Sequence, residues 1–461
     1  MDVHSKGANN MDSLGKLSRR TLVKWGLASA GLPLIPAVLG AAPALARPEP
    51  QDAGKPGEGF AAIPGLKGGQ DMFGAYEVAK GWPDNISTLP GNDKWTWGAG
   101  QSVYAENPDR VFLLFRGELP NIKRPATRLL PDFGPSLQFP IGRLPWRDAT
   151  VSALPGAGGA GQAPENGPKL WKGTVGVDAN WAHCLTVANA EGKITETWTQ
   201  WDHIFKRPHF VVINPYDPEK HVWVVDDHMC AIYKFTHDGK KLVQTIGTPG
   251  AWGADETHFN RPTFLAWLPD STMFVADGYN GTRVVKFDKN GKFLMTWGKP
   301  SWNWQTHQDV PGLSSPPPPN YFKNVHGIAV DAETNRVFVN DRGNHRIQVF
   351  NTDGKYQYEW HIDDEPSDVH LVYIGADRNL WAFDRGTNKM LKYDLDGHFL
   401  YSWGTWGDFP GGFWGVHGFS VDQDGNFYVA EVDNGRVQKF TPRAGANPDF
   451  LVSKPIYSAW K

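Results

Sequence analysis

Three histidines occupy the same place in three copies of an internal repeat: His209, His326 and His417. Each is followed by an apolar run and then by a second run that ends near an acid, at Asp226, Asp341 or Glu431. Equivalent positions of a circular repeat protein face one common axis, so the three imidazoles are expected to meet there. Three imidazoles with one coordination position left open are the pattern of catalytic zinc.

A fourth histidine, His370, has the same register in another copy, ahead of Asp384. It would either join the ligands or contact a substrate, and the sequence leaves both possibilities open. Imidazole ligands suit zinc and other transition metals, whereas calcium prefers oxygen ligands.

The elements that must position these histidines are short strands. A short alternating run, an acidic turn, a second alternating run and an Asp-Gly or Asn-Gly-type turn recur in copies at 222–247, 273–298, 337–360, 380–404 and 427–452, with a more divergent sixth copy at 111–119. Alternation with period two indicates half-buried strands, and such turns favour tight hairpins. Repeats of this kind are typical of propeller blades. We therefore predict an all-β fold, a six-bladed β-propeller over residues 76–461.

Two segments interrupt the repeat, at 119–205 and 299–323. The first contains the Pro- and Gly-rich stretch Leu154–Pro168, and the second contains Pro316–Pro319. Proline has no N–H to donate, so regular ladders are not expected in either segment. We expect both to form a rim around one mouth of the central channel, with a disordered surface insertion as the alternative for the first.

The N-terminus has the features of a targeting signal. Ser18–Lys24 contains twin arginines, the apolar stretch Trp25–Leu39 follows, and Ala44-Leu45-Ala46 resembles a cleavage site. Residues 1–46 are thus predicted to be a twin-arginine signal peptide, with a linker at 47–75 and a periplasmic or secreted mature protein. The apolar stretch is too short to span a membrane, so no stable membrane insertion is expected after removal of the signal.

Charge and cysteine content also limit which partners and which metal ligands are expected. The net charge is −3 with both signs interspersed, and the sequence has no basic stripe, which argues against nucleic acid. Cys184 and Cys230 are the only cysteines, so a thiolate metal site is not expected, while their pairing stays open.

The repeat resembles the NHL repeat in its Asp…Arg…Phe pattern, present at Asp277…Arg283…Phe287 and Asp341…Arg346…Phe350. Between residues 98 and 445 the chain also resembles peptidylglycine amidating lyase, a zinc propeller that splits peptidyl-α-hydroxyglycine into an amide and glyoxylate. The segments that carry this resemblance are Leu113–Gly117, Arg207-Pro208-His209, Asp277-Gly278-Tyr279, Asp341-Arg342-Gly343-Asn344 and Val416-His417.

The resemblance implies a role for each matching residue. His209, His326 and His417 would hold zinc. Tyr279 would be the catalytic base with Arg342 beside it, because a guanidinium lowers the pKa of a tyrosine from its usual value of about 10. Arg116 would reach the substrate or its developing charge.

Two departures from the family pattern matter. Gly418 stands where the family has an acid that helps to hold a structural calcium, so a calcium site is left open. No copper monooxygenase domain precedes the propeller, so we expect a small-molecule or peptide-like substrate.

These features together predict an exported zinc-dependent lyase that cleaves a C–N or C–O bond at a hydroxylated carbon, with a hydratase or hydrolase as related possibilities. One alternative is a non-catalytic NHL-type propeller that binds a ligand or a protein. Another is a lactonase-like metal hydrolase, whose sites are rich in Asp, Glu and Asn around calcium.

Overall fold

The computed structural model describes residues 72–122, 128–129, 137–138, 179–362 and 367–456. These residues belong to one compact unit, Ala53–Lys461. The signal peptide expected at residues 1–46 and the stretch Leu154–Pro168 lie outside the described residues. The part of the chain that is described contains no helix with the length and apolar character needed to cross a membrane.

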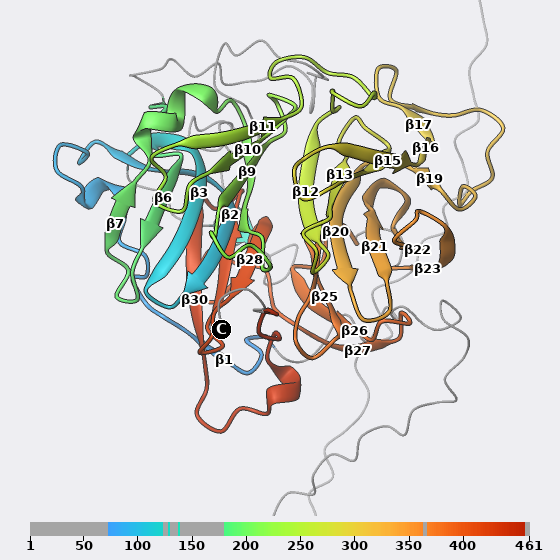
Figure 1. Ribbon diagram of the computed structural model, residues 1–461. Helices are drawn as coiled ribbons and strands as arrows, with labels where there is room; N and C mark the ends of the chain where they lie inside the picture. Colours follow the sequence, from blue (N-terminus) through green and yellow to red (C-terminus); the bar gives the residue numbers. More distant parts are fainter. Residues whose placement is uncertain (1–71, 123–127, 130–136, 139–178, 363–366, 457–461) are drawn as a thin grey trace, which may run out of the picture. The chain divides into compact units, whose positions relative to one another are not determined.

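Six antiparallel sheets of four strands each confirm the predicted all-β, six-bladed propeller (Figure 1). Blade 1 consists of β2 (Trp95–Asn107), β3 (Arg110–Pro120), β6 (Leu185–Ala188) and β7 (Ile194–Thr197). Blade 2 consists of β8 (Pro208–Ile213), β9 (Val222–Asp226), β10 (Ala231–Phe235) and β11 (Leu242–Ile246). Blade 3 consists of β12 (Pro262–Trp267), β13 (Met273–Asp277), β14 (Arg283–Phe287) and β15 (Phe293–Trp297).

The second half of the ring repeats this plan. Blade 4 consists of β20 (Val325–Asp331), β21 (Arg336–Asp341), β22 (Arg346–Asn351) and β23 (Tyr356–His361). Blade 5 consists of β24 (Val369–Ile374), β25 (Leu380–Asp384), β26 (Lys389–Tyr393) and β27 (Phe399–Trp403). Blade 6 consists of β28 (Val416–Val421), β29 (Phe427–Glu431), β30 (Arg436–Pro442) and β1 (Tyr76–Val78).

Blade 6 is completed by the N-terminal strand β1, not by a third run within the copy at 427–452. Tyr76 pairs with Pro442 and Val78 with Phe440. After β30 the chain turns into a short 3₁₀ helix, Pro448–Phe450, and the backbone N–H of Val452 donates to the Tyr76 hydroxyl at 2.8 Å. Both ends of the described chain therefore hold the same blade closed.

The two segments that were predicted to be irregular contain more β-strands than their proline content led us to expect. Strands β6 and β7 of blade 1 lie within 119–205. Leu185–Ala188 forms a fully buried strand, and Ile194–Thr197 forms a strand whose side chains alternate between partly buried and exposed. Within 299–323, two pairs of two-residue strands form: β16 (Lys299–Pro300) with β19 (Tyr321–Phe322), and β17 (Trp302–Asn303) with β18 (Gln308–Asp309). A further short pair joins β4 (Arg128–Leu129) and β5 (Leu137–Gln138).

In blades 3 and 4, the recurring Asp…Arg pattern ties the blade to the segment that leads into its inner strand. In blade 4, Asp341 is fully buried and accepts from Arg346 Nε and from the backbone N–H of Lys323, each at 2.8 Å. Burial raises the pKa of Asp341, and the Arg346 guanidinium opposes that shift. In these two blades the acid is thus a structural brace, and in blade 4 it fixes the start of the strand that carries His326.

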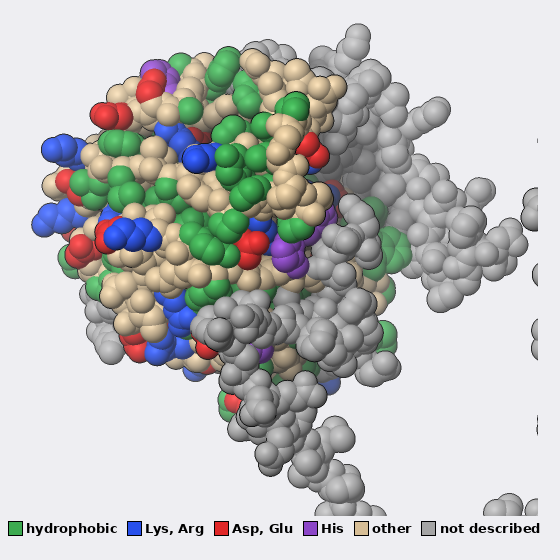
Figure 2. Space-filling model, turned by 90° about the vertical axis from the view of Figure 1, so that its right-hand side faces the viewer, with side chains coloured by type: hydrophobic (Ala, Val, Ile, Leu, Met, Phe, Trp, Pro, Cys, Tyr) green, Lys and Arg blue, Asp and Glu red, His purple; other side chains and the backbone are tan. Residues whose placement is uncertain are grey.

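Blades 1 and 2 are also joined by ion pairs around the buried side chain of Glu106. Its carboxylate lies 2.9 Å from Arg110, 3.0 Å from Lys220 and 2.8 Å from His237. On the face shown in Figure 2, Lys and Arg side chains are interspersed with Asp and Glu, as the small net charge suggests.

Candidate metal centre

The inner strands β8, β20 and β28 bring His209, His326 and His417 together. Their ring nitrogens lie within 4.8 Å of one another, and all three side chains are buried, with 0%, 0% and 3% exposed. Each histidine lies within a register shift of its inner strand, where the pairing with the second strand slips. Such a bulge turns one side chain away from the regular pleat, which here points each imidazole toward the others.

The second nitrogen of each imidazole is held by the backbone of the next blade. The acceptors for Nδ1 of His209, His326 and His417 are, in that order, the carbonyl oxygens of Thr263 (3.1 Å), His370 (2.5 Å) and Gln101 (2.9 Å). A carbonyl only accepts, so Nδ1 carries the proton and Nε2 presents its lone pair. This is the arrangement that orients imidazole for a metal ion.

Ligands and acceptors therefore alternate around the ring. The histidines come from blades 2, 4 and 6, and the carbonyl groups come from blades 3, 5 and 1. Burial and, after it, the charge of the nearby Arg342 guanidinium lower the pKa of His326 to about 3. Burial likewise holds the pKa values of His209 and His417 well below the usual value. All three rings are thus neutral at physiological pH, which is the form that binds metal.

Tyr279 reaches the same point as the histidines. Its hydroxyl lies 3.2 Å from Nε2 of His209, 3.0 Å from that of His326 and 3.4 Å from that of His417. The backbone of Tyr279 is left-handed, with φ of 54°. The preceding Gly278 packs so closely on β20 that a Cβ would come within 1.5 Å of the Val325 carbonyl oxygen. A glycine is needed there for the turn to deliver the phenol to the ring of histidines.

Two guanidinium groups that the sequence analysis did not single out lie over the Tyr279 ring. The centre of the Arg261 guanidinium is 4.4 Å from the ring centroid, and that of Arg207 is 5.4 Å away. Both pair with the fully buried Asp227, which lies 2.6 Å from Arg261 Nη2 and 3.4 Å from Arg207 Nε. Two sequence signals could have indicated these residues. An Arg-Pro pair recurs at the start of β8 and of β12, and two aspartates, Asp226 and Asp227, follow one another at the end of β9.

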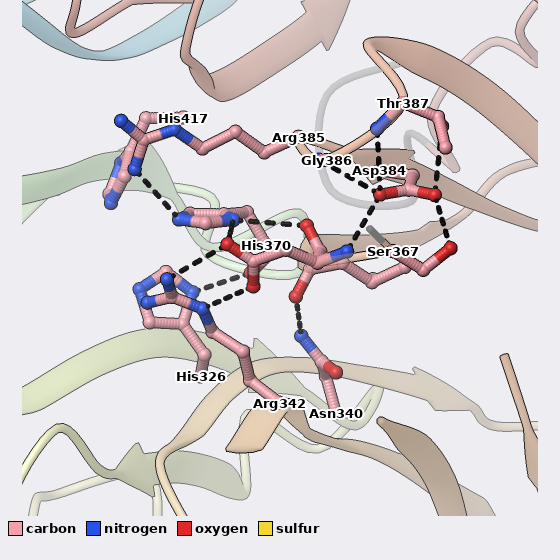
Figure 3. A network of polar contacts seen from close by, with 12 residues as sticks. His326, Asn340, Arg342, Ser367, His370, Asp384, Arg385, Gly386, Thr387 and His417 are labelled. Carbon is pink, nitrogen blue, oxygen red and sulfur yellow. Dashed lines mark hydrogen bonds and ion pairs between the residues drawn. The ribbon is translucent and has the colours of Figure 1, made fainter. Parts of the chain in front are cut away.

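Arg342, which the resemblance put beside Tyr279, forms an ion pair with Asp368. Its Nε and Nη2 donate to the two carboxylate oxygens of Asp368 at 2.7 and 3.0 Å. Figure 3 shows this side chain next to His326 and His370.

Arg116 is buried, and its Nη2 donates to Gln101 Oε1 at 2.6 Å. Burial is the main cause of the low pKa values of His209 and His417, and the charge of Arg116 contributes to both. Arg116 is therefore close to two of the three histidines.

His370 lies beside the three histidines but outside their cluster. Its ring centroid is 5.1 Å from that of His326, and its Nε2 lies 3.5 Å from Arg385 Nη1. Its contribution to the ligand set is its carbonyl oxygen, which accepts from His326. Its imidazole instead faces two arginines.

The remaining sequence expectations concern calcium and cysteine. At Gly418 a Cβ would approach Ser102 Cα to 2.8 Å, so this position supplies no carboxylate. Cys184 and Cys230 are both buried free thiols.

Comparison with known proteins agrees with this architecture. The NHL repeat family matches residues 322–350 and 413–440. Peptidyl-alpha-hydroxyglycine alpha-amidating lyase 1 of Drosophila melanogaster is 28% identical over 281 residues, which cover 57% of this chain and 49% of the fly protein. Peptidyl-glycine alpha-amidating monooxygenase of Mus musculus is 34% identical over 157 residues, or 33% of this chain and 14% of the mouse protein.

Among solved structures, virginiamycin B lyase from Staphylococcus aureus aligns with a TM-score of 0.41 and 13% identity, over 79% of this chain and 99% of that chain. The chain spans about half the length of the fly relative. The chain is an NHL-repeat, lyase-like six-bladed β-propeller that resembles the peptidyl-α-hydroxyglycine α-amidating lyases.

Proposed function

We propose that the chain is an exported, metal-dependent lyase that cleaves the C–N bond of an N-acyl-α-hydroxyglycine, a small-molecule or peptide-like substrate. The observation that carries this proposal is the position of the Tyr279 hydroxyl, 3.0–3.4 Å from Nε2 of all three clustered histidines. A base held at the open side of three metal-binding nitrogens can act on a group bound at that point.

The donor set fits a transition metal such as zinc. His209, His326 and His417 would hold the ion, since each offers Nε2 while its Nδ1 is tied to a carbonyl group. Three imidazoles are a poor set for calcium, which is held by oxygen atoms. When bound, such an ion supplies Lewis acidity that favours loss of the proton from the substrate hydroxyl.

The chain's own residues supply the base and its charge balance. Tyr279, as the phenolate, takes the proton of the hydroxyl on the reacting carbon. The oxygen electron pair then forms the carbonyl, the C–N bond breaks, and the nitrogen takes a proton to leave as an amide beside glyoxylate. No water is consumed. The guanidinium groups of Arg261 and Arg207 over the ring stabilise negative charge on the phenolate, and Asp227 holds both in place.

The substrate carboxylate has a candidate partner in Arg342. Its side chain is partly exposed beside His326, and its planar guanidinium is already oriented by Asp368. Arginine binds carboxylates through parallel hydrogen bonds, which also fixes the orientation of the ligand. Arg116, buried against Gln101, would add positive charge near His209 and His417.

The test is the stoichiometric release of glyoxylate and benzamide from N-benzoyl-α-hydroxyglycine by the purified, metal-replete protein. Tyr279→Phe is expected to keep its metal but to lose turnover by a factor of about 10²–10⁴, the usual contribution of a general base. Tyr233→Phe removes the hydroxyl of a tyrosine in β10 that packs in the hydrophobic core between blades 1 and 2; it is the control and should keep full activity.

Other outcomes identify the alternatives. Calcium in place of a transition metal, with lactone hydrolysis, would favour the lactonase-like enzyme. A metal-free protein with no turnover would favour the non-catalytic propeller.

A further inference from the structure

The arginines around the histidines fall into two groups that differ in exposure. On the Tyr279 side, the side chains of Arg207 and Arg261 are 10% and 2% exposed. In blades 4 and 5, those of Arg342 and Arg385 are 21% and 30% exposed. A ligand can therefore reach the second group, whereas the first group is packed around the phenol.

The exposed arginines flank His370. Figure 3 shows Arg385 and Arg342 approaching this ring from two sides. Arg385 Nη1 lies 3.5 Å from His370 Nε2, and its Nη2 donates to Asp433 of blade 6. His370 Nδ1 lies 3.2 Å from the carbonyl oxygen of Asp368, so Nε2 is left to accept from Arg385. Each guanidinium is thus fixed in direction by a carboxylate, and that of Arg385 also by His370.

Arg342 and Arg385 are each paired with one carboxylate, Asp368 and Asp433, and both side chains stay partly exposed. A partly exposed guanidinium beside a binding site can attract an anion and bind it through its N–H groups. In the proposed function the α-carboxylate of the substrate binds Arg342, so the donors of Arg385 remain for a second acidic group.

We propose that Arg385 and His370 form a second anion subsite beside Arg342, so that the preferred substrate carries an acidic group in its acyl part. This inference rests on the proposed function for the reaction, but the subsite itself is defined by the residues of blades 4 to 6. Arginine suits the role, because a guanidinium with five N–H donors can hold Asp433 and still present donors to a ligand carboxylate.

The first experiment compares matched substrates. N-malonyl-, N-succinyl- and N-glutaryl-α-hydroxyglycine are assayed against the corresponding terminal amides, and kcat/KM is measured from glyoxylate release. At least one acid should exceed its amide by about tenfold or more, the size expected of one hydrogen bond between charged groups. In Arg385→Gln that ratio should fall to about threefold or less, with Arg385→Lys between the two.

The matched control is Arg378→Gln. Arg378 belongs to the same blade and also pairs with an aspartate, Asp331, with a side chain 36% exposed, but it lies beyond the other end of β24. This variant should keep the wild-type ratio. An acid-to-amide ratio that is unchanged in Arg385→Gln, or near one in the wild type, overturns the subsite.

A second measurement does not depend on turnover. Calorimetry with succinate, malonate and glutarate against propionate should show tighter binding of a dicarboxylate in the wild type and in Arg378→Gln, and the loss of that preference in Arg385→Gln. If this pattern holds while no substrate yields glyoxylate, the subsite stands and the proposed reaction falls. If glyoxylate forms with no preference for acids, the reaction stands and the subsite falls.

Discussion

Asp227 is the residue whose replacement tests the electrostatics of the site most directly. Its side chain is fully buried and lies between two guanidinium groups, at 2.6 Å from Arg261 and 3.4 Å from Arg207. Asp227→Asn keeps the shape of the side chain and removes its charge. Two buried cations would then lose the carboxylate that pairs with both of them, while the phenol of Tyr279 stays beside them and the histidines.

The cost can be worked out from burial. Removing one partner of a buried ion pair costs about 3–5 kcal/mol, because a charge is left uncompensated in the interior. For a unit of roughly 400 residues, Ala53–Lys461, an unfolding entropy of about 2.1 cal/mol/K per residue gives about 0.8 kcal/mol/K, so the midpoint should fall by about 4–6 °C. By contrast, Asp353→Asn breaks an exposed pair with Lys286 and should cost about 1 °C or less.

Differential scanning calorimetry at one scan rate measures both variants beside the wild type. The double variant Asp227→Asn with Arg261→Gln should recover part of the loss, because it removes one of the stranded cations. The reasoning is refuted if Asp227→Asn melts within a degree of Asp353→Asn, or if the double variant is less stable than Asp227→Asn alone.

Two further predictions concern the metal and the acid stability of the ring. Elemental analysis should find about one transition-metal ion per chain in the wild type, and His326→Ala should lose most of it. The control His398→Ala removes a partly exposed imidazole that pairs with Asp394, and this variant should keep the ion. Equal metal content in both variants would show that His326 is not a ligand. Burial raises the pKa of Glu106, but hydrogen bonds from His237 and other partners outweigh it, so the pKa lies below 4.5. A depressed carboxyl pKa stabilises the fold above the unfolded value and loses this effect at lower pH. The melting difference between wild type and Glu106→Gln should therefore be largest at neutral pH and shrink as the pH falls below 4.5, and a constant difference would contradict this assignment.

The blades were predictable because their information is local. Turn residues and period-two runs recur in every copy, so the strands of Val222–Ile246 or Arg336–His361 follow from short windows of sequence. The fourth strand of blade 6 was not predictable in this way. Tyr76 and Pro442 pair across nearly the whole chain, and the residues after β30 give no local sign that a strand from the N-terminus replaces them.

The same distinction between local and long-range information applies to the site. The repeat register was enough to bring His209, His326 and His417 to one point, because equivalent positions of a ring share an axis. The ion pairs could not be foreseen, since Asp227 and Arg261, like Arg342 and Asp368, come from neighbouring blades. Their pairing depends on the angle between adjacent sheets, which no single repeat encodes.

The alternation of histidines and carbonyl groups has a consequence for how this scaffold tolerates change. The groups that aim the imidazoles belong to the main chain at Gln101, Thr263 and His370, so replacing those three side chains leaves the acceptors in place. The side chains at these three positions are therefore not needed as acceptors for the Nδ1 atoms of the imidazoles. In a propeller built this way, point substitutions at these positions can change which substrate is bound, while the three histidines keep their orientation.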